Sequence, residues 1–326
     1  MIQERPELSS TAEVVEELRR RAAFVMVSHV KPDGDTLGAG LALGLALEKI
    51  GKRVLYFQQD PVPRTLRFLP GTQRVSRALP ADLPPDALFV FCDMSDRTRA
   101  GAFLPQVARE NVLDVDHHLG NTLFGALNYV LPTECSTGTC VMHLLRGLEV
   151  EIDAEIATCV LTTIMTDTGG LMHSNTSPEA LELAAQLMRI GADKERITRE
   201  IFGNKRIAAT KLLGRVINAM QFGHDGRYCW SCVDDAMLHE CGADGEDTED
   251  MVNVLLGQEG VEVAALFKAY GGELRVSLRS VGRVNVQAAA ASLGGGGHFR
   301  AAGLDFAGSL EEAVAAVDVA LVQQGL

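Results

Sequence analysis

Residues 29–35 read His-Val-Lys-Pro-Asp-Gly-Asp, which places one imidazole and two carboxylates in a single short segment. These side chains are ligands of divalent metal ions. Pro32 and Gly34 break regular structure and would let the three side chains turn the same way. Aspartate and glycine near proline are also ordinary turn chemistry, and His29 alone could be a surface residue. The pattern therefore indicates a metal-binding loop, with a plain turn as the alternative.

Further acidic and histidine residues stand at the ends of apolar runs. Asp93 follows the run 87–92, the triplet Asp116-His117-His118 closes a run that begins at Val112, and Asp167 ends a helical stretch. Each of them alone is typical of a turn or a helix cap. Together with the loop at 29–35 they make a set of candidate metal ligands, namely His29, Asp33, Asp35, Asp93, His117 and Asp167.

The charge of this set suits two divalent ions. Two such ions ~4 Å apart repel by roughly 16 kcal/mol at an effective dielectric constant of about 20, so a bridging carboxylate and further anions are required. The four aspartates of the set balance the charge of two divalent cations. Mixed imidazole and carboxylate ligands fit Mn²⁺ better than Mg²⁺, which favours oxygen shells and keeps its waters. We therefore expect two Mn²⁺ ions that activate a water for hydrolysis.

Short apolar runs must position these residues, and they are typical of buried parallel strands. The runs are 24–27, 54–57, 87–92 and 112–113. Helical stretches such as 37–50 lie between them, and the small residues of that stretch would let a helix pack closely on a sheet. Alternating strands and helices indicate an α/β fold with a parallel sheet. Ligands bind beyond the carboxyl ends of such strands, which is where the acidic and histidine residues fall.

The pattern changes along the chain. Ser10 and Glu13 have capping-box spacing and predict an opening helix, and residues 154–219 are predicted to be mostly helical, with a helix starting at Ser177-Pro178 and stopping at Gly191. Strand-like alternation follows over 227–233, 261–267 and 274–281, and two helices are predicted over 285–292 and 309–322. The sequence therefore predicts a first domain over 1–194, a helical connector over 195–218 and a smaller α+β domain over 219–326.

The composition is that of a folded globular protein. The chain has 326 residues and a net charge of −13, so it fits two domains and repels long polyanions. Its seven cysteines lack the density of a disulfide scaffold, and Cys229 and Cys232 would face opposite sides of a strand. No stretch of about 20 apolar residues offers a membrane span. We therefore expect a cytoplasmic protein.

The segment 234–250 is strongly acidic. We expect it to be solvated surface, with a lid over the site as the second option.

The order of the motifs resembles that of the DHH phosphoesterase family, with Ser28-His29, Pro32-Asp33-Gly34-Asp35, Asp93, Asp116-His117-His118 and Asp167. The C-terminal run Gly-Gly-Gly-Gly-His at 294–298, followed by Ala301-Ala302-Gly303, resembles the signature of the family's DHHA1 substrate domain. The resemblance covers nearly the whole chain. It implies a parallel-sheet DHH domain and a smaller DHHA1 domain across a cleft. The layout most resembles the NrnA-like nano-RNases, which also act as 3′-phosphoadenosine-5′-phosphate phosphatases.

The resemblance also implies roles for individual residues. One Mn²⁺ would be held by His29, Asp33 and Asp93, and the other by Asp35, Asp93, His117 and Asp167, so that Asp93 bridges the two ions. His118 would be a catalytic donor or proton carrier beside the scissile phosphate. Asp116 would orient the histidines, with a purely structural role as the alternative.

The expected substrate residues lie in a basic part of the chain, since residues 268–300 hold five cations against one acid. The segment Ser277-Leu278-Arg279-Ser280 resembles the family's substrate-contact segment, so Arg279 is the expected phosphate clamp. The glycine run would let backbone N–H groups approach a phosphate or a base, and a flexible connector is the alternative. Arg275 and Arg300 could equally be solvated surface residues. The predicted substrate-binding residues are Arg279, Ser280, Arg283, Asn285, Gly296, Gly297 and His298.

We therefore expect two-metal hydrolysis of short oligonucleotides (nano-RNA, pApA, pGpG) to 5′-mononucleotides, and of 3′-phosphoadenosine-5′-phosphate to AMP. A cyclic-dinucleotide (c-di-AMP) phosphodiesterase is the alternative, because the same core would serve it. The glycine-rich tail disfavours an inorganic pyrophosphatase. The chain length disfavours a processive RecJ-type exonuclease, and the complete ligand set disfavours a non-catalytic nucleotide sensor. The expected substrates are short RNA or DNA oligonucleotides or nucleotides. No membrane partner is expected, and a homodimer is one option for assembly.

Overall fold

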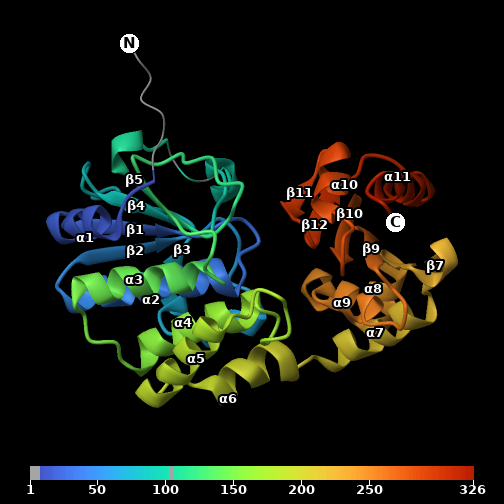
Figure 1. The fold of residues 1–326 in the computed structure, drawn as a ribbon, viewed down its shortest axis with the longest axis horizontal. Helices are drawn as coiled ribbons and strands as arrows, with labels where there is room; N and C mark the ends of the chain where they lie inside the picture. Colours follow the sequence, from blue (N-terminus) through green and yellow to red (C-terminus); the bar gives the residue numbers. More distant parts are fainter. Residues whose placement is uncertain (1–7, 103, 105) are drawn as a thin grey trace, which may run out of the picture. The chain divides into compact units, whose positions relative to one another are not determined.

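The computed structural model describes residues 8–102, 104 and 106–326. It divides into two compact units, Met1–Asn204 and Lys205–Leu326, which Figure 1 colours from blue to yellow-green and from yellow to red. The division falls inside the range 195–218, which overlaps α6 (Lys194–Ile197), a π-helix (Thr198–Gly203) and α7 (Ile207–Asn218). The role of this range as a helical connector stays a prediction.

The first unit opens with α1 (Thr11–Arg20), whose N-cap is Ser10. The Ser10 hydroxyl accepts from the Glu13 N–H at 3.3 Å, and the Ser10 N–H donates to the Glu13 carboxylate at 2.7 Å. This reciprocal capping box satisfies amide donors that the helix cannot pair internally. The predicted opening helix is confirmed.

Six parallel strands form the sheet of the first unit, in the order β3-β2-β1-β4-β5-β6. The apolar runs predict this arrangement, because strands covered on both faces are apolar throughout. The strands are β1 (Ala23–Val27), β2 (Arg53–Phe57), β3 (Val75–Ser76), β4 (Leu88–Cys92), β5 (Val112–Asp116) and β6 (Leu127–Val130). The central strands β1, β4 and β5 are neighbours, so their carboxyl ends lie at one edge of the sheet.

The two faces of this sheet are covered differently. Phe24 and Met26 of β1 pack into a core made with helices, whereas Val25 and Val27 point to the other face, which connecting segments cover. The helices are α1, α2 (Gly34–Lys49), α3 (Thr137–Leu148), α4 (Ala154–Asp167) and α5 (Pro178–Ile190) (Figure 1). Short 3₁₀ turns occupy the connections, at Arg64–Leu66, Thr72–Arg74, Arg97–Ala100 and Arg109–Asn111. As predicted, α5 begins at Pro178 with Ser177 as its N-cap, and Gly191 caps its C-terminus.

The glycines of α2 explain how this helix is buried. A Cβ on Gly38 would lie 2.7 Å from a Thr163 methyl carbon and 2.8 Å from the Cys159 carbonyl oxygen, both on α4, and a Cβ on Gly44 would lie 2.5 Å from the Tyr56 hydroxyl of β2. The predicted close packing on the sheet is therefore present, and a close contact with α4 accompanies it. This contact brings the start of α2 to the end of α4, where Asp167 lies.

The second unit is built on a mixed sheet in the order β11-β12-β10-β9-β8-β7. Only the pair β8 and β9 is parallel among the described strands of this sheet. The strands are β7 (Gln221–Gly223), β8 (Tyr228–Asp234), β9 (Val263–Tyr270), β10 (Glu273–Ser280), β11 (Gly296–His298) and β12 (Ala301–Asp305). The predicted change from a parallel to an α+β arrangement is confirmed.

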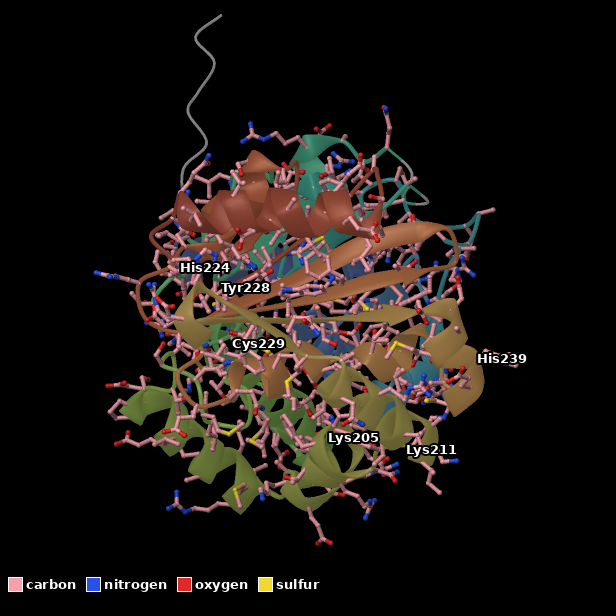
Figure 2. The ribbon with its side chains drawn as sticks, turned by 90° about the vertical axis from the view of Figure 1, so that its right-hand side faces the viewer. Lys205, Lys211, His224, Tyr228, Cys229 and His239 are labelled. Carbon is pink, nitrogen blue, oxygen red and sulfur yellow. The ribbon has the colours of Figure 1, made fainter. Side chains whose placement is uncertain are left out.

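Helices cover both faces of this second sheet. Successive residues of β8 face opposite sides, with Tyr228 in the core beside α10 (Val286–Ser292) and α11 (Leu310–Val322), and Cys229 in the core beside α7, α8 (Asp235–Cys241) and α9 (Met251–Leu256) (Figure 2). Cys232 packs against the core that contains Tyr228, so Cys229 and Cys232 lie on opposite faces, as the strand assignment predicts. This separation removes the geometry that a redox or zinc CxxC pair needs.

The acidic segment 234–250 is more ordered than a solvated surface stretch. It contains α8 and a 3₁₀ turn at Gly245–Thr248, and Met237 and Leu238 are buried. The Arg206 guanidinium lies 2.9 Å from the Asp244 carboxylate and 2.6 Å from the Asp247 carboxylate. Part of this acidic charge therefore fixes the residue that precedes α7, which the sequence analysis did not predict. Across the described ranges, no helix has the length and apolar character needed to cross a membrane.

Candidate metal centre

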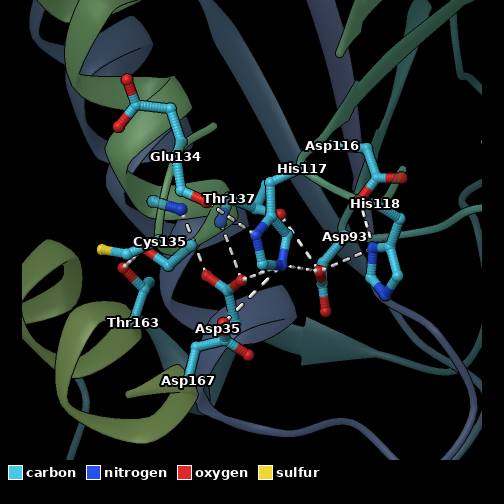
Figure 3. Close-up of polar contacts among 12 residues, drawn as sticks. Asp35, Asp93, Asp116, His117, His118, Glu134, Cys135, Thr137, Thr163 and Asp167 are labelled. Atoms are coloured by element: carbon cyan, nitrogen blue, oxygen red, sulfur yellow. Dashed lines mark hydrogen bonds and ion pairs between the residues drawn. The ribbon is translucent and has the colours of Figure 1, made fainter. Parts of the chain in front are cut away.

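The six predicted ligands come from three strand ends and two helices of the first unit. His29 follows β1, Asp93 follows β4 and His117 follows β5, while Asp33 and Asp35 lie at the start of α2 and Asp167 is the last residue of α4. The side chains of Asp35, Asp93, His117 and Asp167 point toward one another in Figure 3. The parallel sheet thus brings together residues that are far apart in the sequence, as expected for its carboxyl edge.

The first group of candidate ligands is His29, Asp33 and Asp93, whose ligand atoms all lie within 4.8 Å of one another. His29 Nε2 is 3.4 Å from Asp93 Oδ2 and 3.7 Å from Asp33 Oδ2. These separations are too long for hydrogen bonds but suit atoms that surround a common ion. His29 Nε2 is buried and has no hydrogen-bond partner within the described part of the chain. A metal ion would satisfy this nitrogen.

The second group is Asp35, His117 and Asp167, again with ligand atoms within 4.8 Å of one another. His117 Nε2 is 3.7 Å from Asp35 Oδ2 and 3.8 Å from Asp167 Oδ2. Asp93 also reaches this group, because its Oδ1 atom is 3.6 Å from His117 Nε2. The two oxygens of Asp93 therefore face different groups, which is the orientation that a bridging carboxylate needs.

Asp93 has an unusual backbone. Its φ angle is 63°, in the left-handed region that non-glycine residues rarely adopt. A conformation of this kind costs on the order of 1–3 kcal/mol and persists where the surroundings hold it. The Asp93 N–H donates to the Val115 carbonyl oxygen at 3.0 Å, which ties the residue to β5. The strain lies at the residue that both groups share, which is typical of a functional site.

Backbone carbonyls hold the two histidine rings. His29 Nδ1 lies 2.8 Å from the Val30 carbonyl oxygen, and His117 Nδ1 lies 3.2 Å from the Glu134 carbonyl oxygen. A carbonyl can only accept, so Nδ1 carries the proton in each of these contacts when the ring is neutral, and Nε2 presents its lone pair to the carboxylates. This is the usual arrangement of metal-binding histidines.

The charges of the site are unbalanced without cations. Burial and the carboxylates of Asp93 and Asp167 raise the pKa of Asp35 well above its ordinary value. Burial and nearby carboxylates also raise the pKa of Asp167 to about 7, although His117 acts in the opposite direction. Burial opposes a charge on His29, but Asp33 and Asp93 outweigh it and raise its pKa to about 10. Burial is the main cause of the two aspartate shifts, and the neighbouring carboxylates add to them and raise the pKa of His29, so divalent cations would relieve a buried excess of negative charge.

His118 and Asp116 form a hydrogen-bonded pair beside the two groups. His118 Nδ1 lies 2.6 Å from Asp116 Oδ1 and 3.5 Å from Asp93 Oδ1. Asn121 Nδ2 donates to the other Asp116 oxygen at 2.7 Å and to the Met94 carbonyl oxygen at 3.1 Å. Burial opposes a charge on His118, but Asp116 and Asp93 outweigh it and raise its pKa. The structure therefore places a carboxylate-oriented histidine next to Asp93.

Several residues around the site were not predicted from the sequence. The Thr137 and Gly138 N–H groups donate to the Asp35 carboxylate at 2.8 and 3.1 Å, and the Thr137 hydroxyl donates to Asp93 Oδ1 at 3.1 Å. Asn175 Nδ2 donates to Asp167 Oδ2 at 3.2 Å. Ser136 before an apolar helical run is a helix N-cap signal, so the start of α3 was predictable but its contact with the ligands was not.

The predicted substrate residues of the second unit lie in different environments. Arg279 is on β10, on the side of the sheet opposite to Leu278, and its guanidinium donates to the Leu278 carbonyl oxygen at 3.0 Å. Burial lowers the pKa of Arg279, although Asp250 and Glu249 raise it. No ion pair joins Arg279 to a carboxylate among the described residues. Arg275 lies on the same side of β10 as Arg279 but forms ion pairs with Glu273 at 2.6 Å and Asp305 at 3.1 Å.

Three further substrate predictions fall at the end of β10 and on the connection that follows it. Ser280 is buried and its hydroxyl donates to the Val284 carbonyl oxygen at 2.8 Å. The Asn285 side chain accepts from the Ala288 N–H at 3.0 Å and caps α10, while Arg283 is exposed. The substrate roles of all three stay predictions. Ser280 and Asn285 already have structural roles here.

The second half of the glycine run is part of the sheet rather than a flexible connector. Gly296 and Gly297 belong to β11, which pairs with β12. A Cβ on Gly297 would lie 2.5 Å from the Ala301 carbonyl oxygen and 2.6 Å from Ala302 Cα, whereas a Cβ on Gly296 would meet nothing within 4 Å. Close strand packing therefore explains Gly297, and Gly296 keeps an open side. The side chain of His298 lies outside the described part of the structure.

Two family models match the chain. The model described as "DHH family, N-terminal domain" matches residues 23–164, and the model described as "DHHA1 domain" matches residues 226–323. The first range holds five of the six candidate ligands and ends just before Asp167. The second range holds all the predicted substrate residues.

Individual proteins agree with these matches. The chain is 36% identical to the bifunctional oligoribonuclease and PAP phosphatase NrnA of Thermus thermophilus, over 92% of this chain and 90% of the relative. It superposes on the crystal structure of an exopolyphosphatase-related protein from Bacteroides fragilis with a TM-score of 0.87 and 25% identity, covering 96% of both chains. A structure of RecJ from Thermus thermophilus in complex with Mn²⁺ shares the fold at a TM-score of 0.57 and 17% identity, covering 96% of this chain and 54% of RecJ.

Proposed function

Because the chain belongs to the DHH family of phosphoesterases, we propose that it hydrolyses short oligonucleotides to 5′-mononucleotides, and 3′-phosphoadenosine-5′-phosphate to AMP, with two Mn²⁺ ions. The observation that carries this proposal is that Asp93 faces two separate groups of candidate ligands, one around His29 and one around His117, with His118 close enough to Asp93 and His117 to form a third, overlapping group. One group alone would support a single ion, whereas a shared carboxylate favours a pair.

The residues present fit the proposed ions. The first ion would be held by His29, Asp33 and Asp93, and the second by Asp35, His117, Asp167 and Asp93. The buried Nε2 of His29 and the raised pKa values of Asp35 and Asp167 both call for cations. The mixture of imidazole and carboxylate favours Mn²⁺; RecJ of Thermus thermophilus, which shares this fold, has structures in complex with Mn²⁺ and with Mg²⁺. When bound, the ions would supply an ionised water and neutralise charge on the phosphate.

The protein side chains would contribute proton transfer and binding. His118, held by Asp116 at 2.6 Å, would donate a proton or a hydrogen bond to the scissile phosphate, and Asp116 would keep the ring oriented. In the second unit, the guanidinium of Arg279 lacks a carboxylate partner among the described residues and would bind a substrate phosphate. Arg283, Asn285 and the backbone near Gly296 and Gly297 would add weaker contacts.

Two observations favour small substrates. The relative at 36% identity carries both named activities, on oligoribonucleotides and on 3′-phosphoadenosine-5′-phosphate (PAP). The net charge of −13 also disfavours long nucleic acids. A c-di-AMP phosphodiesterase remains the alternative, because the metal centre alone does not distinguish a cyclic from a linear dinucleotide.

A substrate panel tests the proposal. Purified protein with Mn²⁺ is assayed on linear pApA and pGpG, RNA five-mers, longer RNA, a matched DNA five-mer, 3′-phosphoadenosine-5′-phosphate and c-di-AMP. We expect the highest kcat/KM on dinucleotides and five-mers, activity on 3′-phosphoadenosine-5′-phosphate, and loss of activity with EDTA. A higher kcat/KM on c-di-AMP than on pApA would replace the proposal with the alternative. No turnover of any phosphoester with Mn²⁺ would overturn both.

A further inference from the structure

Residues 134–138 end the connection after β6 and begin α3, and they contact three of the six candidate metal ligands directly and a fourth through Asn175. The Glu134 carbonyl oxygen lies 3.2 Å from His117 Nδ1, and the Cys135 carbonyl oxygen accepts at 3.2 Å from Asn175, which also donates to Asp167. The Thr137 and Gly138 N–H groups bind Asp35. Figure 3 shows this segment beside the four ligands. All of these ligands belong to the second group or bridge to it.

Thr137 makes the only side-chain contact from this segment to Asp93 among the described hydrogen bonds, at 3.1 Å from its hydroxyl oxygen to Asp93 Oδ1. We propose that Thr137 is a positioning residue that holds the Asp93 carboxylate in its bridging orientation and so sets the affinity for the ion held by Asp35, His117 and Asp167. This inference rests on the proposed two-ion centre.

The geometry explains why one hydroxyl can have this effect. Asp93 Oδ1 faces His117 Nε2 at 3.6 Å, whereas Oδ2 faces His29 Nε2 at 3.4 Å. A rotation of the carboxylate would remove Oδ1 from the second group. The Thr137 hydroxyl donates to Oδ1 in a fully buried environment, where a hydrogen bond to a charged oxygen is stronger than a neutral one.

Helix capping does not account for the Thr137 hydroxyl. The N-cap of α3 is Ser136, whose hydroxyl accepts from the Thr139 N–H at 3.3 Å, and the Thr139 hydroxyl lies 3.4 Å from the Ser136 N–H in a reciprocal capping box. The cap is therefore complete without Thr137. Its backbone N–H binds Asp35 independently of the side chain, so a substitution can remove the Asp93 contact while the Asp35 contact remains.

The test compares Thr137→Val, which replaces the hydroxyl by a methyl group of similar size, with Thr137→Ser, which keeps the hydroxyl. The matched control is Thr162→Val, because Thr162 is also fully buried but its hydroxyl donates to the Thr158 carbonyl oxygen of its own helix and to no candidate ligand among the described hydrogen bonds. Mn²⁺ binding to the metal-free full-length proteins is followed by titration calorimetry and by the EPR signal of free Mn²⁺.

We expect wild-type protein to bind two ions. In Thr137→Val we expect the dissociation constant of one ion to rise about 10- to 100-fold, as for other residues that orient metal ligands. The dissociation constant of the other ion should stay within about 3-fold of wild type. In Thr137→Ser and Thr162→Val, the dissociation constants of both ions should stay within about 3-fold of wild type. We also expect kcat of Thr137→Val to recover at high Mn²⁺, with KM for pApA unchanged.

Wild-type affinity for both ions in Thr137→Val would overturn the inference and leave the proposed function standing. An equal loss in Thr137→Ser would also overturn it, because the hydroxyl would not be the cause. Fewer than two ions on the wild-type protein would overturn the two-ion centre itself. If circular dichroism shows that Thr137→Val is unfolded, Thr137→Ala is judged by the same criteria.

Discussion

The two sheets of this protein treat the residues at their strand ends differently. In the first unit β1, β4 and β5 are parallel, so His29, Asp93 and His117 meet at one edge. In the second unit β9, β10 and β12 are antiparallel. The residues at the end of β10 and just after it are used locally, since Ser280 bonds the following loop and Asn285 caps α10. A parallel sheet therefore gathers a multi-residue centre, whereas the mixed sheet offers mainly one cation, Arg279.

The largest effect is expected at the residue that both metal-binding groups share. Asp93→Ala removes the two oxygens that face His29 and His117, so we expect kcat with Mn²⁺ to fall by about 10³-fold or more. Steady-state kinetics on pApA and Mn²⁺ titration measure the change. A variant that keeps both ions and near wild-type kcat would remove Asp93 from the centre.

A smaller effect is expected in the second unit, and it should appear in KM rather than kcat. Arg279→Gln removes a guanidinium that would bind a substrate phosphate, and a lost charged hydrogen bond corresponds to about 10- to 100-fold in KM. Arg275→Gln is the matched control, because Arg275 has the same parity on β10 but is paired with Glu273 and Asp305. Equal effects of the two changes would mean that general charge, rather than Arg279, determines binding.

The parallel sheet also buries a carboxyl group whose stability effect depends on pH. Burial and Asp116 raise the pKa of Asp114 to about 8, and both carboxylate oxygens lack a hydrogen-bond partner among the described residues. The folded state keeps this proton up to about pH 8 while the unfolded state loses it near pH 4, so the free energy of unfolding should fall as the pH rises through this window, by up to about 1.4 kcal/mol per unit.

Asp114→Asn removes this dependence. Between pH 6 and 8, urea denaturation at fixed Mn²⁺ should show wild-type protein losing about 2 kcal/mol relative to Asp114→Asn. Asp86→Asn, which changes an exposed carboxylate of the same unit, serves as the control. Parallel pH profiles of wild type and Asp114→Asn would show that Asp114 is charged in the folded protein at pH 6.

The smallest effect is expected at Ser280, where the sequence predicts a substrate contact and the structure shows a hydrogen bond to Val284. Ser280→Ala should lower the free energy of unfolding by about 1 kcal/mol and leave KM within about 2-fold of wild type. Chemical denaturation and kinetics on pApA measure the two quantities. A rise in KM as large as that of Arg279→Gln would return Ser280 to the substrate site and weaken the contrast between the two sheets.

The sequence alone predicts the fold class, the main strands and helices, and the set of candidate metal ligands, but not short strands such as β3 and β6 or the helix α3. Apolar runs such as 87–92 fold as buried strands, and parallel strands end at one edge, so Asp93 and His117 could be expected to meet without knowledge of any contact. The capping box at Ser10 and the helix that starts at Pro178 were predictable because their signals are local.

Only the tertiary structure decided which side chains orient the ligands and which predicted contacts are already used. Thr137 reaches Asp93, and Asn175 reaches Asp167, because separate segments pack together, and no local pattern records those contacts. The same holds for Arg275, whose partner Asp305 lies on the neighbouring strand β12. The sequence fixes which groups can bind a metal or a phosphate, because that depends on residue type and strand ends; their orientation depends on long-range packing.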